Sequence, residues 1–432
     1  MKKDRKILVI ANNCFSLSNS NGRTLGNLFQ GWPKENLAQM CVIAKEPLWD
    51  LCDNYYCIED NSILHAFLQR RKAEGRILKR YKEKDIFSPM IDTKRRQIGK
   101  KTLPKFIIRE IAWAWDRWRS KAFEQWIDEF YPNMVVLQFG DSSFMIDIAL
   151  YIAQSRNIPL VVYNTEGYYF FDKFWYHPSV VDWVLFPFYK RYYDQKVRKL
   201  MKYASSSVYL NEELKEDYDD AFKKPSTVIY NSSCLKRFTT PLFKGRSIRI
   251  SYLGGLGHGR DSALRDVGEV IHSIDPCCHI DVYGPGEETI VRQLKQAVGV
   301  EYHGVVSYET VQKVMSESDL LFHVEPTTGC NDQLRYAFSG KIADSIMSGK
   351  CFVLYAPKDL ACSKYIIDNQ CAWFAETKDD LHDVLLRIFN NEKERIEILH
   401  RAKEIAEMNH NYERNAKRFQ SILINESVKK LI

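Results

Sequence analysis

Short apolar runs alternate with segments of helical periodicity along the chain, and this alternation constrains the fold more than any other feature. Ile7 to Ile10 begins the series, and helix-period segments such as Ile111 to Phe130 separate the runs that follow. This alternation is typical of a parallel sheet wound with helices. The rhythm restarts at Ile248 to Leu253, after a segment with Pro241 and Gly245 that is typical of a linker. The pattern therefore predicts an α/β protein with two Rossmann-like domains over residues 1–240 and 241–411, and a tail, 412–432, that packs back on the first domain.

The composition excludes several classes of protein. Of the 432 residues, 45% are hydrophobic and 27% charged, which does not suit a disordered or low-complexity chain. The net charge of +7 is a mild excess that suits anionic phosphates or lipids and does not imply nucleic acid. We find no apolar run of ~18–20 residues that would span a bilayer, and no signal peptide, so we expect a cytoplasmic protein. The 11 cysteines are scattered without zinc-ligand spacing, which indicates free thiols.

The first local signal is a glycine-rich turn between an expected strand and an expected helix. It reads Tyr252-Leu253-Gly254-Gly255-Leu256-Gly257-His258-Gly259-Arg260. Glycines let backbone amides approach a phosphate, and the N-terminus of the following helix adds a favourable dipole. The spacing is not the dinucleotide fingerprint, because Arg260 stands where the third glycine would be. A phosphate site and a plain tight turn are both open interpretations.

The second signal is an expected short helix between Ser339 and Gly349. Ser339 suits the N-cap and Gly349 the C-terminus. Lys341 and Asp344 then share a face near the start of the helix. At the carboxyl edge of a parallel sheet, the cation would meet a phosphate and the carboxylate would accept from hydroxyls. The alternative is an ion pair on a solvated face.

Together the two signals resemble the carboxyl-terminal half of a family-4-type glycosyltransferase of the GT-B fold, in which two Rossmann-like domains face each other across a cleft. The first half of the chain resembles this family more loosely. The residues that carry the resemblance in the second half are Tyr252 to Arg260, Asp281-Val282-Tyr283-Gly284, Glu301-Tyr302-His303-Gly304, Ser318-Asp319-Leu320-Leu321 and Ser339 to Gly349.

This resemblance implies that a sugar is transferred from a nucleotide diphosphate donor to an acceptor, with retention of the anomeric configuration. Arg260 and Lys341 would neutralise the leaving diphosphate, and Asp344 would bind the ribose. Gly254, Gly255, Gly257 and Ser339 would complete the donor site. The family's earlier glutamate is replaced by Tyr336, and Glu325, after an expected strand, is a second candidate for the donor site. Because of Tyr336, a catalytically silent nucleotide-binding partner subunit stays an alternative, as does a GT-B-fold epimerase or phosphorylase.

Three residues of the first domain are candidates for the acceptor side. Gly22 lies in the loop after the first strand, where the family approaches donor and acceptor. Asp141 and Glu166 each follow an expected strand, and either carboxylate would act as a general base or bind an acceptor hydroxyl. The alternative is that each caps the next helix.

Aromatic residues are concentrated between Tyr168 and Tyr193, and basic residues such as Lys196, Arg198 and Lys199 follow them. Rings beside cations suit an anionic membrane surface or a lipid-linked acceptor, whereas a packed aromatic lid is the alternative. If these rings and cations face a membrane, the protein is peripheral to the inner face of the cell membrane. The resemblance implies a glycan or lipid-linked acceptor in surface polysaccharide assembly.

We expect no metal and no cofactor besides the nucleotide sugar. Asp217-Tyr218-Asp219 imitates an Asp-x-Asp metal motif, but its helical periodicity indicates an exposed acidic face. His258, His303 and His323 show no ligand spacing, so hydrogen-bonded structural roles are expected for them, and His258 alone is a candidate for a place near the phosphate.

Overall fold

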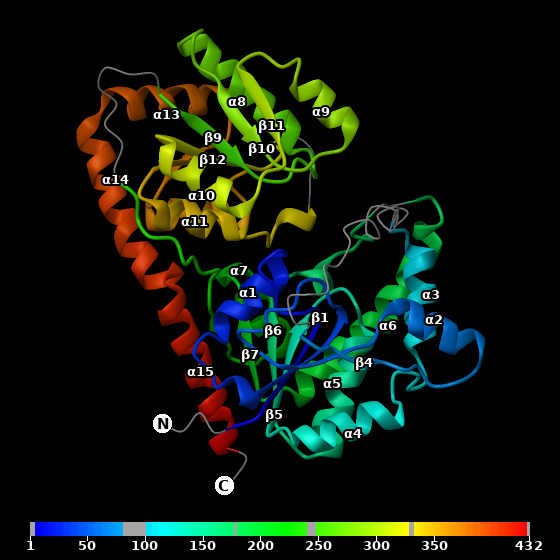
Figure 1. Ribbon diagram of the computed structural model, residues 1–432. Helices are drawn as coiled ribbons and strands as arrows, with labels where there is room; N and C mark the ends of the chain where they lie inside the picture. The colour runs from blue at the N-terminus through cyan, green and yellow to red at the C-terminus, as the bar shows by residue number, and fades with distance from the viewer. Residues whose placement is uncertain (1–4, 81–100, 177–178, 240–247, 328–331, 430–432) are drawn as a thin grey trace. The chain divides into compact units, whose positions relative to one another are not determined.

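The computed structural model describes residues 5–80, 101–176, 179–239, 248–327 and 332–429. The chain divides into two compact units, of which unit 1 comprises Met1–Ile229 with Ala416–Ile432, and unit 2 comprises Tyr230–Asn415. Within the described ranges, each unit is built on a sheet of mostly parallel strands covered by helices (Figure 1). This confirms the expected α/β class.

The sheet of unit 1 has the strand order β4-β3-β2-β1-β5-β6-β7-β8, and every pairing is parallel except β3 with β4. Its central strands are fully buried, as their runs of Val, Ile and Leu require. The strands are β1 (Ile7–Asn13), β2 (Leu37–Ile43), β3 (Asn54–Cys57), β4 (Arg76–Ile77), β5 (Met134–Phe139), β6 (Leu160–Asn164), β7 (Ser206–Tyr209) and β8 (Thr227–Val228).

The helices of unit 1 cross over between these strands. They are α1 (Ser20–Leu28), α2 (Asp60–Leu68), α3 (Leu103–Trp113), α4 (Lys121–Phe130), α5 (Phe144–Ser155), α6 (Asp182–Tyr203) and α7 (Glu212–Phe222). The segment 111–130, expected as one amphipathic stretch, is divided between α3 and α4. The division arises because Trp115 and Asp116 take left-handed backbone angles, and because Ser120 caps α4 by accepting from Phe123 N.

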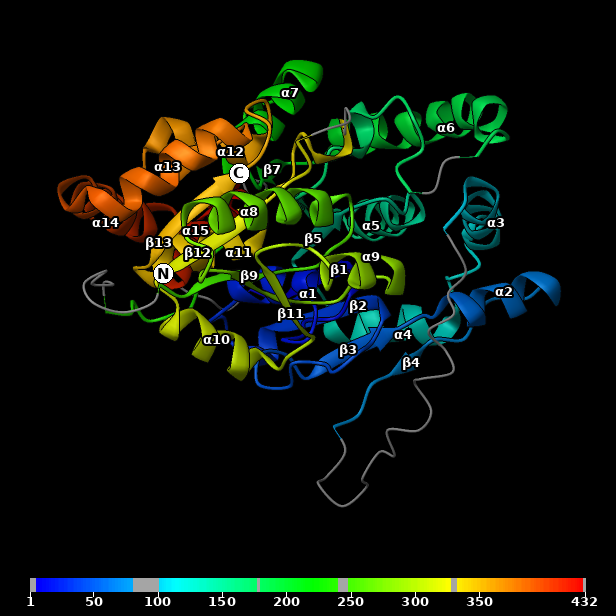
Figure 2. The ribbon, with the colours of Figure 1, turned by 90° about the horizontal axis from the view of Figure 1, so that it is seen from above.

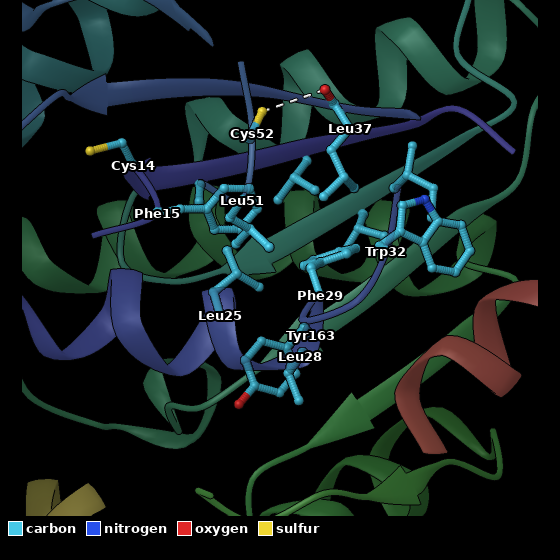
Figure 3. Close-up of a cluster of buried hydrophobic side chains, with 14 of the residues drawn as sticks. Cys14, Phe15, Leu25, Leu28, Phe29, Trp32, Leu37, Leu51, Cys52 and Tyr163 are labelled. Carbon is cyan, nitrogen blue, oxygen red and sulfur yellow. Dashed lines mark hydrogen bonds between the residues drawn. The ribbon is translucent and has the colours of Figure 1, made fainter. Parts of the chain in front are cut away.

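A core of aliphatic and aromatic side chains fills the space between α1 and the sheet of unit 1. Phe15, Leu25, Phe29 and Tyr163 converge there (Figure 3). Cys52 belongs to the same core, where its thiol donates to the carbonyl of Leu37 at 3.4 Å. The cysteines within the described ranges are free thiols, as expected, and most are buried.

The sheet of unit 2 has the order β11-β10-β9-β12-β13-β14, which is the complete six-strand order of a dinucleotide-binding Rossmann fold. Its helices α8 and α10 lie on two sides of β9 (Figure 2). The strands are β9 (Ile250–Leu253), β10 (Ile280–Tyr283), β11 (Val300–Gly304), β12 (Leu320–Val324), β13 (Cys351–Tyr355) and β14 (Trp373–Ala375). The helices are α8 (Arg260–Ile274), α9 (Glu288–Leu294), α10 (Tyr308–Glu317), α11 (Gly340–Ser348), α12 (Ala361–Asn369), α13 (Lys378–Asn390) and α14 (Glu392–Ile405).

The segment after β8 packs with unit 2 rather than with unit 1. Asn231 donates from its side-chain amide to the carbonyl of Phe338 at 2.7 Å, and Ser233 N donates to the carbonyl of His410 at 2.9 Å. These bonds explain why unit 2 begins at Tyr230. The expected boundary between residues 240 and 241 lies outside the described residues.

The last helix, α15 (Tyr412–Lys429), passes from one unit to the other, and from Ala416 onward it belongs to unit 1. There Phe419 packs on Phe29 with ring centroids 5.5 Å apart, and the Gln420 amide donates to the carbonyl of Gln30 at 2.8 Å. Unit 1 therefore includes chain from both ends of the sequence.

None of the helices in the described ranges is both long enough and apolar enough to cross a membrane.

Candidate functional site

The glycine-rich turn of unit 2 follows β9 directly. A Cβ on Gly254 would stand 2.4 Å from the hydroxyl of Tyr252, so glycine is required there by packing. A Cβ on Gly255 or Gly257 would meet nothing within 4 Å. Their absent side chains therefore leave backbone facing open space, which is the condition for close approach of a ligand to the main chain.

Arg260 starts α8, and its guanidinium binds the carboxylate of Glu325. Nε donates to Oε2 at 3.0 Å and Nη2 donates to Oε1 at 2.7 Å. The two residues meet because β9 and β12 are adjacent parallel strands, whose carboxyl ends lie at the same edge of the sheet. The side chain of Arg260 is 17% exposed and that of Glu325 is 1% exposed. The pair is therefore almost buried, with the arginine toward the surface.

His323 and Lys341 extend this charged group. His323 Nε2 lies 3.1 Å from Oε1 of Glu325. Burial alone would raise the pKa of Glu325, but the contacts with His323 and Arg260 lower it to about 2. Burial lowers the pKa of His323, and the charges of Arg260 and Lys341 act in the same direction. His323 is therefore neutral at pH 7 and donates to a charged Glu325, and both cations act on the same buried imidazole.

The helix α11 has the ends that its sequence predicts. Ser339 is the N-cap and accepts from Lys341 N at 3.3 Å, while Gly349 ends the helix with a φ of 82°. Lys341 is exposed and Asp344 is half-buried one turn later. Tyr336, which replaces the family's earlier glutamate, is buried beneath the guanidinium of Arg335.

The residues predicted for the donor side thus lie at the carboxyl edge of the sheet of unit 2. The structure brings Arg260 and Glu325 into direct contact and places the charge of Lys341 near His323. The guanidinium uses Nε and Nη2 for Glu325, so among the contacts of the described residues Nη1 is the group left for an anion. With the N-terminus of α8 beside it, this edge is suited to binding a phosphate group.

In unit 1, Asp141 and Glu166 follow β5 and β6, which are neighbouring parallel strands. Asp141 accepts from the hydroxyl of Ser142 at 2.7 Å and from the hydroxyl of Tyr176. Burial raises the pKa of Glu166 to about 7, and the negative charge of Asp141 acts in the same direction. The backbone N–H of Glu166 donates to the side chain of Asn164 at 3.0 Å. The two carboxylates therefore influence each other, and Glu166 can exchange a proton near neutral pH.

Gly22 lies in the first turn of α1, where its N–H donates to the Asn19 side chain at 2.6 Å. A Cβ there would stand 2.3 Å from the carbonyl oxygen of Cys14. The glycine is therefore required by the close approach of α1 to the end of β1, independently of any ligand.

The aromatic segment is divided between two environments. Tyr169, Phe174 and Trp175 are buried, whereas Trp183 and Phe188, at the start of α6, are 86% and 75% exposed. Of the basic residues, Lys196 binds Asp147 at 2.6 Å, and Arg198 and Lys199 are exposed. The buried part of the segment agrees with the alternative prediction of a packed aromatic lid. The exposed part forms an apolar surface.

Sequence reasoning missed the contacts of three residues that shape these sites. His323 has the hydrogen-bonded role expected for it, but its partner, Glu325, was not predicted. Arg109 contacts Ser142 at 2.6 Å and Asp60 at 2.8 Å, and Tyr176 contacts Asp141. His323 is two residues from Glu325, a spacing that puts both on one face of a strand and was the available signal. Nothing in the sequence indicates that Arg109 or Tyr176 reaches the end of β5.

Comparison with known sequences gives a match over part of the chain. Residues 263–421 match a family model described as glycosyl transferase-like. This match covers less than half of the chain and lies mostly in unit 2. A search of curated protein sequences gives no significant match.

Solved structures match nearly the whole chain. HepE from Anabaena, crystallised with UDP, is 11% identical over 97% of this chain and 100% of its own, with a TM-score of 0.63. Sucrose-phosphate synthase from Thermosynechococcus elongatus is 12% identical over 98% of each chain, with a TM-score of 0.58. A glycosyltransferase from Rickettsia africae is 10% identical over 98% of this chain and 99% of its own, also with a TM-score of 0.58.

At these identities the likeness shows the fold, which is that of the GT-B glycosyltransferases with two parallel-sheet domains. The expected fold class is therefore confirmed. The family match within unit 2 and the shared fold together support a glycosyltransferase.

Proposed function

We propose that the chain is a retaining glycosyltransferase of family-4 type, which moves a sugar from a nucleoside diphosphate sugar to a glycan or lipid-linked acceptor. The observation that carries this proposal is the Arg260–Glu325 pair at the carboxyl edge of the unit 2 sheet, whose strand order is typical of nucleotide-binding domains. The charge of Lys341 acts on the same group of side chains. We place the acceptor in surface polysaccharide assembly, which follows from the resemblance and not from any contact in the structure.

In this reaction the bond between the sugar and the diphosphate breaks, and negative charge develops on the leaving phosphate. Glu325 holds Arg260 by two hydrogen bonds, so that Nη1 is pre-oriented toward the anion. Lys341 and the N-terminus of α8 supply further positive potential. We propose that these groups replace a metal ion in stabilising the leaving group.

The rest of the donor binds by groups that suit its chemistry. The backbone at Gly255 and Gly257 approaches the phosphates, because no side chain stands in the way. Asp344 accepts hydrogen bonds from ribose hydroxyls, one helical turn from Lys341. Since HepE was crystallised with UDP and with UDP-glucose, these two compounds are the first probes to use.

Unit 1 offers groups for the acceptor hydroxyl. Glu166 accepts its hydrogen bond or its proton, because a carboxyl with a pKa of about 7 is half ionised at neutral pH. The side-chain nitrogen of Asn164 is buried without a hydrogen-bond partner among the described residues, so a bound hydroxyl would satisfy it. Asp141 is held by Ser142 and Tyr176 beside Glu166 and keeps the pKa of Glu166 raised.

Calorimetry of nucleotide binding tests the donor site. We expect Lys341→Ala to weaken the binding of UDP by about tenfold or more, because it removes a cation from the diphosphate, and to leave the binding of uridine nearly unchanged. Lys364→Ala, on α12 and exposed, is the matched control and should change neither affinity. Equal losses for UDP and uridine in Lys341→Ala would refute the assignment.

The position of Tyr336 favours a second candidate, a nucleotide-binding subunit without catalysis. A buried tyrosine stands where the resembled family has a glutamate for the donor sugar. Slow hydrolysis of UDP-glucose or of another nucleotide sugar by the purified protein would support the enzyme. Tight UDP binding with no turnover in a panel of donors would support the subunit.

A further inference from the structure

Histidine and carboxylate side chains gather on one face of the edge strand β11 and its neighbour β10 in unit 2, apart from the anion site. His279 immediately precedes β10, which contains Asp281, and β11 contains Glu301 and His303. The strands are parallel, and Asp281 pairs with Glu301 in register. Because side chains alternate along a strand, the four residues share one face, while Ile280 points into the core on the other.

The spacing of the cluster is that of ligands around a small cation. Nε2 of His279 lies 3.5 Å from Oδ1 of Asp281 and 3.1 Å from Oε2 of Glu301. One ligand atom from each of the three lies within 4.8 Å of the other two. In a tetrahedral zinc site with bonds of about 2.0–2.2 Å, ligand atoms stand about 3.3 Å apart. A cation would fit among these side chains, on the face of the two strands, with only small side-chain movements.

His303 supports this cluster from the side. Its Nε2 lies 2.6 Å from Oδ1 of Asp281, and its ring is stacked on Tyr283 with centroids 4.6 Å apart. A ligating carboxylate is commonly held by such an outer hydrogen bond, which fixes the direction of its lone pairs. The ring of Tyr283 in turn fixes the imidazole.

The surroundings carry excess negative charge. Asp281 and Glu301 belong to the cluster, and Glu317 lines the cavity beside it. Arg249 offsets one of them, since it lies 3.3 Å from Glu317. A cavity of about 310 Å³ opens beside His279, Asp281 and Tyr283. Solvent would reach a cation at this site. The fourth coordination position, which the three protein ligands leave open, would face the cavity.

We propose that His279, Asp281 and Glu301 bind one zinc-type divalent cation, with His303 as a positioning residue for Asp281. The cation would join the edge strand β11 to β10 and so stabilise unit 2. This site lies on the face of the strands, with His279 before the start of β10, whereas Arg260 follows the carboxyl end of β9. The metal is therefore separate from the metal-independent transfer proposed above.

The ligand chemistry selects the ion. Imidazole suits zinc, cobalt and nickel, while magnesium and calcium prefer a shell of oxygen atoms. Three protein ligands with an open fourth position would leave room for water or for a ligand in the cavity. Spacing along one strand does not indicate this group of ligands, because they come from two strands.

Metal binding to the full-length apo protein tests the proposal. With zinc in competition with a chromogenic chelator, we expect one ion per chain, and with Co²⁺ a visible absorption typical of tetrahedral coordination. His279→Gln and Glu301→Gln should each weaken binding by at least about tenfold, and His303→Gln by roughly tenfold, as for outer-shell partners. Zinc should also raise the Tm of the wild type and not that of His279→Gln.

Two controls separate this site from other sources of metal affinity. His400→Gln removes an exposed histidine that lies 3.7 Å from Glu404 and outside the cluster, and should leave zinc binding unchanged. Cys277→Ser with Cys278→Ser removes the nearby thiols and should also leave it unchanged. Unaltered zinc affinity in both His279→Gln and Glu301→Gln, or its loss in the cysteine variant alone, would overturn the proposal. Circular dichroism of each variant shows whether it is folded.

Discussion

Glu166 and Glu325 are both carboxylates that follow a strand, yet their pKa values move in opposite directions. Glu325 is buried against Arg260 and His323, which lower its pKa to about 2. Glu166 is buried beside a second carboxylate, which leaves its pKa at about 7. The sequence shows the same local pattern in both cases, so the difference depends on which neighbours the fold supplies.

The raised pKa of Glu166 predicts that this residue lowers stability at alkaline pH. Because the folded state binds its proton more tightly than the unfolded state does, stability falls as pH rises from about 4.5 to about 7. Glu166→Gln should therefore be more resistant to urea than the wild type at pH 8, nearly equal at pH 4.5, and impaired in sugar transfer.

Urea unfolding at the two pH values is the measurement, and Glu216→Gln, an exposed residue of α7, is the control that should show no such difference. If Glu166→Gln gains no stability at pH 8, the carboxyl is ordinary and its role as a proton acceptor loses its basis.

At the scale of elements, α6 is divided along its length. Tyr189 and Tyr193 are buried within unit 1, whereas Val180, just before the helix, and Trp183 and Phe188, in its first turns, are exposed apolar side chains. Aromatic and branched side chains that project together into water are typical of a surface that contacts lipid or another protein. Exposed Arg198 and Lys199 lie further along the same helix. We therefore propose that the start of α6 contacts an anionic membrane.

Vesicle sedimentation tests this surface. Trp183→Ala with Phe188→Ala should lower partitioning onto phosphatidylglycerol vesicles by about tenfold, because both rings lose their contact with lipid. Tyr131→Ala is the control. Tyr131 is 74% exposed, but it precedes β5 and so lies at the amino ends of the strands, away from the start of α6. Equal partitioning of the double variant and the wild type would exclude α6 as the membrane contact.

At the scale of the whole molecule, one buried side chain can form hydrogen bonds to segments that are far apart in the sequence. His410 lies in a short π-helix, Ala406–His410, and is fully buried. Its Nδ1 donates to the carbonyl of Asn231 at 2.7 Å, and its Nε2 accepts from the hydroxyl of Tyr365 at 2.8 Å. The neutral ring thus joins the beginning, the middle and the end of unit 2.

This arrangement predicts a pH-dependent stability. Burial lowers the pKa of His410 from 6.5 to about 4. The unfolded state therefore takes up the proton first, so stability is complete above about pH 6.5 and falls as the pH decreases toward 4, by on the order of 3 kcal/mol. His410→Gln should show a smaller loss over this range in urea unfolding than the wild type, and His400→Gln should match the wild type. Equal pH slopes in all three proteins would show that another group causes the loss.

The sequence by itself determined the α/β class with two parallel-sheet domains, and the ends of α11. Strand and helix periods are local properties, and Ser339 and Gly349 act on the residues next to them, so no distant information was needed. The glycine-rich turn and its position before a helix were determined in the same way.

Only the tertiary structure decided which side chains share a site. Arg260 meets Glu325 because β12 lies beside β9, although 65 residues separate the two in the chain. Likewise His279 meets Glu301 because β11 pairs with β10 in register, which no spacing within one strand indicates. Protonation states and ligand sets depend on neighbours in space, and strand order, not sequence distance, fixes those neighbours.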